Sequence, residues 1–504
     1  MKTNRRYGRI VVWVSLLAGG LAASVAWACG GFFCQLIPIN QAGEQIIFRQ
    51  DGNQVTVIVQ IQYAGDAEDF SWVLPVPGVP TFELASDLIF SPLELATRPQ
   101  FVLDVEGDPC VLPEFDFANS PSAGDAGGAD ESADGVEVLV ETSVGPFALQ
   151  LVTSEDPAAM ATWLEENNYD IGDRGQDLIT PYVEEGMNFV ALRLLQNQSV
   201  GDIQPLKIVY ESDTPMIPIR LTAVAAVDDM GVLVWMLGES RAVPLNYPHV
   251  NVNYTKLNWY NGTFAAFADY QDLVTEAMNE TGDGQGFATD YAGRDIDVPS
   301  QLPDPDAFRS ELARLGAIED VQEFYLELAN NFLFPQDQVL GILRRQLPLP
   351  ADQDEVVYQI PDLLEDAVGA EAMEAARTPI LNELIDGVVT PLENSLAVFD
   401  DMPYITRLFT TLSAEEMTVD PVFSFNPDLD DQPLTRRATL RFTCDQPGQD
   451  WEVELGQGTG RDGEVVIRGT GLAPGFGAAQ PEVDQPAIAS SVRLSQTGPG
   501  EPVA

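Results

Sequence analysis

Gln54-Val-Thr-Val-Ile-Val-Gln-Ile-Gln-Tyr63 is the stretch of sequence that decides the fold class. Its odd-numbered positions are all apolar, whereas its even-numbered positions are polar except for Ile58. A period of two over ten residues predicts a β-strand with one buried face. Asp51-Gly52 is a turn signal, so a second strand is expected before it, over Gln45–Arg49.

The next segment continues this β-rich pattern. Phe70–Val76 carries large apolar residues at every second position, which predicts another strand. Pro75 and Pro77 lack a backbone N–H, so this strand is expected at the edge of a sheet or leaving it. We therefore predict that residues 29–115 form an antiparallel, β-sandwich-like domain.

The rest of the chain changes character several times, and the whole is predicted to be an α+β protein. An acidic, disordered linker is expected over 116–135, because it lacks large apolar residues. The other predicted segments are an α+β domain (136–270, with a strand over 217–227), a Gly/Asp-rich loop (271–302), a mainly helical region (303–417, with a last helix over 404–412), short C-terminal strands (418–470) and a disordered tail (471–504).

Residues 1–28 have the three parts of a secretory signal peptide. The start is basic, the run from Ile10 to Ala23 is apolar, and Ala26-Trp27-Ala28 has small residues at the expected cleavage positions. A membrane anchor is less favoured, because a span needs ~20 apolar residues. We predict export to the periplasm or the medium, with cleavage after Ala28. Lipidation of Cys29 is the alternative, but the bulky Trp27 disfavours it.

The chain is strongly acidic, with 78 Asp and Glu against 25 Lys and Arg and a net charge of −53. Such a charge repels nucleic acid and anionic membrane surfaces, so neither is an expected partner. An unknown extracellular or envelope partner is expected instead. The charge indicates a solvated acidic surface more readily than a protein bridged by cations.

His249 is the single histidine of the chain. A zinc site with several histidines cannot be built, and any Ser-His-Asp or Cys-His arrangement would have to use this residue. It lies next to Pro248, at the start of a stretch expected to be a strand. An ordinary role at the surface or in packing is favoured over a catalytic one.

The four cysteines are expected to pair in an oxidising compartment. Cys29 and Cys34 are close enough in sequence to bridge each other, and Cys34 with Cys110 is an equal candidate. Cys444 is remote in sequence and is the one expected to be left free. The spacing of Cys29 and Cys34 is not that of a C-x-x-C redox motif, so a structural bond is favoured.

Two acidic clusters are weak candidates for calcium, which is the only cofactor considered. Asp66, Glu68 and Asp69 lie in an expected turn, where a polar hairpin is the simpler interpretation. Asp283 and Asp290 lie among glycines, but the D-x-D-x-D-G spacing of a calcium loop is absent.

Six stretches together resemble one family of exported bacterial proteins. They are Ala28–Cys34, Asn40–Glu44, Gln62–Pro77, Pro218–Ala223, Tyr404–Phe409 and Glu416–Pro421. The family that the chain resembles is domain-of-unknown-function family 2330. The resemblance implies export and a shared fold, and because the family is uncharacterised it provides no catalytic residues.

Three functions remain compatible with the sequence. A non-enzymatic envelope or extracellular protein that binds or scaffolds is favoured, because no catalytic signature is present. A hydrolase of the glycosidase type is the second hypothesis, since it needs two carboxylates and no histidine. A calcium-stabilised adhesion protein is the third.

Overall fold

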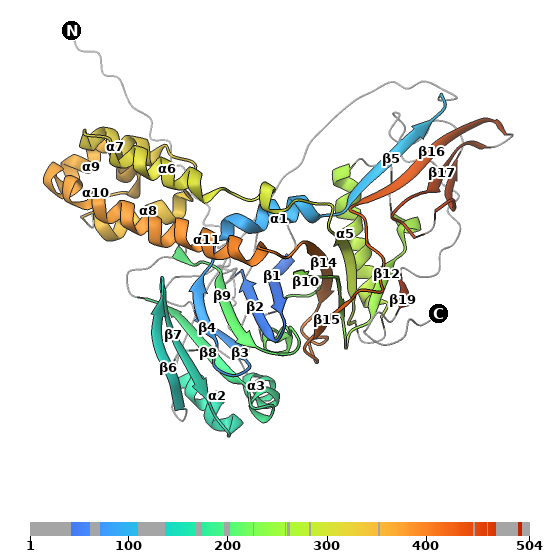
Figure 1. Ribbon diagram of the computed structural model, residues 1–504, viewed down its shortest axis with the longest axis horizontal. Coiled ribbons are helices and arrows are strands. Elements are labelled where there is room, and N and C mark those ends of the chain that lie inside the picture. Colours follow the sequence, from blue (N-terminus) through green and yellow to red (C-terminus); the bar gives the residue numbers. More distant parts are fainter. Residues whose placement is uncertain are drawn as a thin grey trace, which may run out of the picture.

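The computed structural model describes residues 42–60, 71–108, 137–167, 169, 174–195, 202–224, 226–257, 259, 263–281, 284–350, 353–446, 449–460, 462–469 and 492–495. Over these residues the fold is of the mixed α+β class, as predicted, with several sheets and a separate group of helices (Figure 1). None of the helices in this part of the chain is both long and apolar enough to cross a bilayer.

A nine-stranded sheet, called sheet A, forms the centre of the molecule (Figure 1). In spatial order its strands are β19 (Val492–Ser495), β12 (His249–Val252), β13 (Phe287–Gly293), β14 (Tyr404–Leu412), β10 (Met230–Gly238), β1 (Ala42–Asp51), β2 (Gln54–Val59), β9 (Leu206–Glu211) and β4 (Thr81–Leu84). The N-terminal sheet was predicted to be antiparallel: β1 does pair in this way with β2, but it pairs in parallel with the distant β10. Strands from several predicted segments thus share one sheet.

The alternating residues Gln54–Val59 form β2. Its alternation is confirmed, since Val55, Val57 and Val59 all point into one core. The opposite face is buried as well, and Ile58 packs into a second core. A strand in the interior of a layered protein is covered on both sides, which explains why its even-numbered face is not wholly polar.

A four-stranded sheet, called sheet B, packs against one face of sheet A. Its order is β3 (Ser71–Val76), β8 (Asn188–Leu194), β7 (Phe147–Thr153) and β6 (Glu137–Val144). The proline-containing β3 is an edge strand, as predicted. The outer face of sheet B is covered by α2 (Pro157–Glu166) and α3 (Gly175–Glu184).

The other face of sheet A is covered by helices and continues into a helical arm. Helices α1 (Phe90–Thr97) and α5 (Thr263–Asn279) lie against the sheet. The arm consists of α6 (Pro305–Gly316), α7 (Val321–Ala329), α8 (Gln336–Gln346), α9 (Pro361–Val368), α10 (Ala370–Leu384) and α11 (Thr390–Leu396), with a π-helical turn at Ile385–Val389. Figure 1 shows α6–α10 projecting away from the sheets as a separate bundle, whereas α11 returns to them.

Two smaller sheets complete the fold. Sheet C contains β18 (Val465–Gly469), β17 (Gln449–Leu455), β16 (Thr435–Gln446) and β5 (Gln100–Glu106), and a two-stranded sheet pairs β11 (Arg241–Pro244) with β15 (Phe423–Asn426). The C-terminal strands predicted over 418–470 are therefore confirmed.

Three predicted segments contain strands where none was expected. β14 replaces the helix predicted over 404–412, and β13 lies within the predicted loop 271–302. Both strands are buried throughout, so their neighbours in sheet A override local propensity. β19 lies in the predicted tail 471–504 and pairs with β12. The predicted signal peptide (1–28) and the predicted linker (116–135) lie outside the described residues.

Candidate functional site

A pocket lies in the core between sheet A and the edge strand β3. We call it the Glu44 pocket. It is lined by Glu44, Ile46, Phe48, Val57, Val59, Leu74, Pro75, Val76, Pro77, Ile208, Tyr210, Met216, Ile217 and Pro218. The space between these side chains, together with the open solvent at its mouth, measures about 420 Å³. Apolar walls with few polar groups are typical of small-molecule pockets.

Gly43 places the Glu44 side chain. The register between β1 and β10 shifts between Ala42 and Glu44, so Gly43 is an extra residue in its strand. Such a bulge locally re-aims side chains. A Cβ atom at position 43 would lie 2.5 Å from Cγ of Met230, so only glycine fits without a shift. Glu44 then faces inward together with Ile46.

The carboxyl group of Glu44 is the polar feature that stands out in this pocket. The residue is 1% exposed, and its Oε2 atom has no hydrogen-bond partner among the described residues. Burial raises the pKa of Glu44 from 4.5 to about 8, because a charged carboxylate would lose its hydration. Burial also raises the pKa of Tyr210, the other titratable residue in the lining. Both groups are therefore neutral at pH 7.

The segment 216–218 closes one side of the pocket, and Asp420 holds Arg220, which follows this segment. The strand predicted over 217–227 is wrong, because a short helix, α4 (Ile219–Thr222), starts there. The carboxylate of Asp420 accepts hydrogen bonds from the backbone N–H of Arg220 (3.0 Å) and from its Nε (2.8 Å). It thus satisfies a backbone donor that the first turn of a helix leaves open.

The same carboxylate connects this segment to the helices on sheet B. Tyr182 of α3 donates a hydrogen bond to Oδ1 of Asp420 (2.8 Å). The guanidinium of Arg220 lies 4.3 Å from the centre of the Tyr182 ring and also pairs with Glu185 (2.8 Å). The wall of the pocket is therefore fixed by charged contacts that lie outside it.

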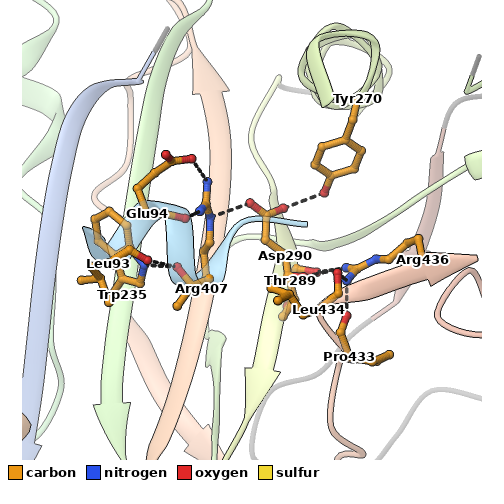
Figure 2. A network of polar contacts seen from close by, with 11 residues as sticks. Leu93, Glu94, Trp235, Tyr270, Thr289, Asp290, Arg407, Pro433, Leu434 and Arg436 are labelled. Carbon is orange, nitrogen blue, oxygen red and sulfur yellow. Dashed lines mark hydrogen bonds and ion pairs between the residues drawn. The ribbon is translucent and has the colours of Figure 1, made fainter. Parts of the chain in front are cut away.

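A second cluster of polar groups lies on the opposite face of sheet A (Figure 2). Arg407 of β14 donates from Nε to Oδ2 of Asp290 (2.9 Å) and from Nη1 to the backbone oxygen of Glu94 (3.0 Å). Its Nη2 lies 3.4 Å from Oε1 of Glu94. Tyr270 of α5 donates to Oδ1 of Asp290 (2.6 Å).

Arg436 of β16 extends this network towards sheet C. Its guanidinium is fully buried and donates to the backbone oxygen of Asp290 (2.7 Å) and to the hydroxyl of Tyr254 (3.1 Å). It also donates to the backbone oxygen of Pro433. The network thereby joins α1, α5, β13, β14 and β16 around two arginines (Figure 2).

The two clusters differ in what they offer to a ligand. Both carboxylate oxygens of Asp290 are occupied by protein donors, from Arg407 and Tyr270. A buried network whose members bond one another holds elements together and specifies their arrangement. Glu44, in contrast, has a buried oxygen without a partner at the wall of a pocket. The candidate binding site is therefore the Glu44 pocket.

Of the acidic residues predicted as metal ligands, the described part of the chain contains Asp290 alone. Asp66, Glu68, Asp69 and Asp283 lie outside it. Asp290 lies in a strand rather than a loop. Within the described residues, no group of three or more His, Cys, Asp or Glu side chains could hold a metal ion.

His249 is a buried residue of β12. Its Nε2 lies 3.1 Å from Oγ1 of Thr289, and burial together with the charge of Arg241 lowers the pKa of His249 to about 3. The imidazole is therefore neutral at physiological pH.

The predicted disulfide cysteines Cys29, Cys34 and Cys110 lie outside the described residues. Cys444, which was expected to be free, lies beside the end of β5, and its Sγ is 3.8 Å from the backbone oxygen of Asp108. No cysteine in the described part of the chain is free. The expectation for Cys444 is therefore wrong.

Glu44 was not among the residues predicted to be functional. The sequence did contain an indication. Glu44 lies two positions before Ile46 and four before Phe48, so its side chain is on the same, inward face of the strand. Buried carboxylates are rare unless paired or functional.

Fold and site together define a layered α+β protein with a mostly apolar pocket in its sandwich core. The chain belongs to a family described as uncharacterized protein conserved in bacteria (DUF2330), whose model matches residues 23–312. All residues that line the Glu44 pocket lie within this match. No curated protein and no solved structure matches the chain.

Proposed function

We propose that this protein is an exported, non-enzymatic binding protein that takes an apolar small molecule into the Glu44 pocket. The observation that carries this proposal is the Oε2 atom of Glu44, which is buried without a partner in a mostly apolar lining. An unsatisfied buried polar atom costs about 1–3 kcal/mol. A ligand that supplies its hydrogen-bond partner would recover that energy and bury apolar surface as well.

Binding is supported over hydrolysis by the composition of the pocket. A glycosidase needs two carboxyl groups about 5–9 Å apart across the scissile bond. Glu44 is the one carboxyl among the described residues of the lining, and the other titratable group is the phenol of Tyr210. This set can bind and orient a molecule, but it lacks the acid and base pair of that mechanism.

Export is the part of the proposal that rests on residues 1–28, with their basic start, apolar run and Ala-x-Ala pattern. Expression of the full chain in a bacterium, followed by fractionation and mass spectrometry of the N-terminus, tests it. A mature chain that starts at Cys29 outside the cytoplasm is expected. An intact Met1 in the cytoplasmic fraction would contradict export.

A pocket-filling substitution tests the binding site. Leu74→Phe adds volume inside the pocket, and Leu192→Phe adds the same volume in the same core, on a residue outside the lining. Octanamide serves as the probe, measured by isothermal titration calorimetry. We expect binding by wild type and by Leu192→Phe and none by Leu74→Phe. Equal binding by all three proteins would contradict this site.

A further inference from the structure

We propose that the ligand of the Glu44 pocket carries a neutral hydrogen-bond acceptor on an apolar body, and that Glu44 recognises this acceptor by donating a hydrogen bond from its carboxylic acid. This inference rests on the proposed function, because it concerns the ligand of the same pocket. Amides, esters and ketones with an alkyl or aryl body are the ligand classes that fit.

The placement of Glu44 makes its carboxyl the group that a ligand meets. The Oε2 atom is buried and has no partner among the described residues, and Ile46, Phe48 and Val59 contribute apolar surface to the same lining. Among the lining residues that the structure describes, Tyr210 is the other titratable one. A ligand therefore finds one strong polar contact in an apolar environment, which fixes its orientation.

Lys207 and Arg220, which lie close in sequence to lining residues of the pocket, are already paired with carboxylates. On β9, Lys207 binds Glu83 (2.8 Å). After the segment 216–218, Arg220 binds Asp420 (2.5 Å) and Glu185 (2.8 Å). Neither cation lines the pocket, so neither supplies a counter-charge that would ionise Glu44. An uncharged carboxyl is the form that this environment favours.

The protonation state decides which atom of the ligand is recognised. Burial raises the pKa of Glu44 to about 8, so at pH 7 the group has a proton to donate. A carboxylic acid kept neutral by an apolar site can act as a hydrogen-bond donor to an oxygen atom. A carbonyl oxygen of the ligand is the natural acceptor.

Charged ligands fit the pocket less well. An anionic ligand would enter an apolar cavity without a cation and would also meet the negative field of a chain with net charge −53. A cationic amine could pair with an ionised Glu44, but burying both charges carries a desolvation penalty that their attraction does not reliably offset.

Three unbranched probes with about the same number of carbon atoms separate these alternatives. Octanamide, octylamine and sodium octanoate are titrated into wild type at pH 6.5 by isothermal titration calorimetry. We expect octanamide to bind most tightly. Tighter binding of octylamine or octanoate would overturn the inference, although it would leave a binding pocket in place.

Two variants identify the donor. Glu44→Gln keeps the size and an N–H donor at every pH, whereas Glu44→Leu removes the donor. We expect the octanamide Kd to change little in Glu44→Gln and to rise about 3- to 10-fold in Glu44→Leu, as the loss of one hydrogen bond implies. Equal affinity of Glu44→Leu and wild type would overturn the inference.

The pH dependence of octanamide binding separates recognition by Glu44 from a purely structural role, because a structural role would not make the affinity depend on pH. From pH 6.5 to pH 9.5 wild type should lose affinity for octanamide as the carboxyl ionises, while Glu44→Gln should stay constant. A flat profile in wild type would also overturn the inference. Failure of the proposed function looks different: no probe would bind wild type at any pH.

Discussion

Asp420 holds Arg220, two hundred positions earlier in the chain, through both its backbone N–H (3.0 Å) and its Nε (2.8 Å). This contact fixes the start of α4 directly after the segment that closes the Glu44 pocket. The side chain of Asp420 is 6% exposed and that of Arg220 is 15% exposed, so the pair is largely shielded from water. Asp420, which lies outside the matched family residues 23–312, therefore supports a pocket whose described lining residues lie inside them.

Removing Asp420 should destabilise the protein. Asp420→Ala leaves the guanidinium of Arg220 without its buried partner, which costs about 3–5 kcal/mol of unfolding free energy. Glu185→Gln is the matched control, because Glu185 pairs with the same arginine but is half exposed. The control should lose less than about 1 kcal/mol in urea denaturation. Similar losses in the two variants would contradict this assignment.

Asp290 should matter for stability and not for metal binding. Asp290→Asn removes the charge that Arg407 contacts at 2.9 Å. We expect a loss on the order of 3 kcal/mol, since it leaves a buried arginine short of a partner. Asp297→Asn, an exposed change in the same segment, should have little effect. Thermal unfolding in buffer with a chelator checks both, and an unaltered melting temperature for Asp290→Asn would contradict the role.

Glu44 should make stability depend on pH with a definite sign. The folded pKa of about 8 lies above the ordinary 4.5, so between these values the folded protein binds more protons than the unfolded chain. The stability contribution is fully present below about pH 4.5 and is lost as the pH rises through about 8. At about 1.4 kcal/mol per pKa unit, the loss over the interval from 4.5 to about 8 is on the order of 5 kcal/mol.

Urea denaturation of wild type and Glu44→Gln at pH 5 and pH 8.5 measures this effect, because the other titrating groups are common to both proteins. Wild type should lose stability relative to Glu44→Gln as the pH rises. A difference between the two proteins that stays constant over this interval would show that Glu44 is ionised in the folded state.

Gly43 should tolerate no side chain. Gly43→Ala places a Cβ atom 2.5 Å from Cγ of Met230, and relief of such a clash typically costs about 1–3 kcal/mol. Gly387→Ala is the control, because a Cβ atom there meets no atom within 4 Å. The control should be neutral or slightly stabilising, since alanine favours helix. Chemical denaturation compares them, and equal stability of both variants with wild type would argue against the bulge.

Cys444 should pair with Cys110. In sheet C, Arg441 of β16 lies opposite Glu106 of β5, and Sγ of Cys444 lies 3.8 Å from the backbone oxygen of Asp108. Cys110 follows two positions later in the sequence. Non-reducing digestion and mass spectrometry should find peptides that contain Cys110 and Cys444 linked. A Cys34–Cys110 link, the other candidate for this cysteine, would contradict the pairing.

Local periodicity in the sequence predicted individual strands and their positions in a sheet. The alternation over 54–63 identified β2, and Pro75 placed β3 at an edge. The pattern could not reveal that β1 pairs with β10, because a parallel partner almost two hundred residues away leaves no local signal. The strands β13 and β14 were missed for a related reason. Their residues locally favour a loop or a helix, but neighbouring strands on both sides stabilise the extended conformation, and Arg407 of β14 binds Asp290 of β13.

The candidate site was harder to predict than the fold. Its walls come from β1, β2, β3, β9 and the segment 216–218, which only the sheet pairings bring together. Three of the stretches that carried the family resemblance nevertheless contribute to it, through Glu44, Leu74–Pro77 and Pro218. The sequence thus contained the residues of the pocket but not their juxtaposition.

Infrared difference spectroscopy at pH 7 tests the central claim most directly, because it observes the Glu44 carboxyl itself. Wild type should show the C=O stretch of a protonated carboxylic acid that is missing from Glu44→Gln, and octanamide should shift it to lower frequency as the new hydrogen bond forms. A carboxylate band in place of the acid band, or an acid band that octanamide leaves unchanged, would contradict the claim that Glu44 donates to a neutral ligand.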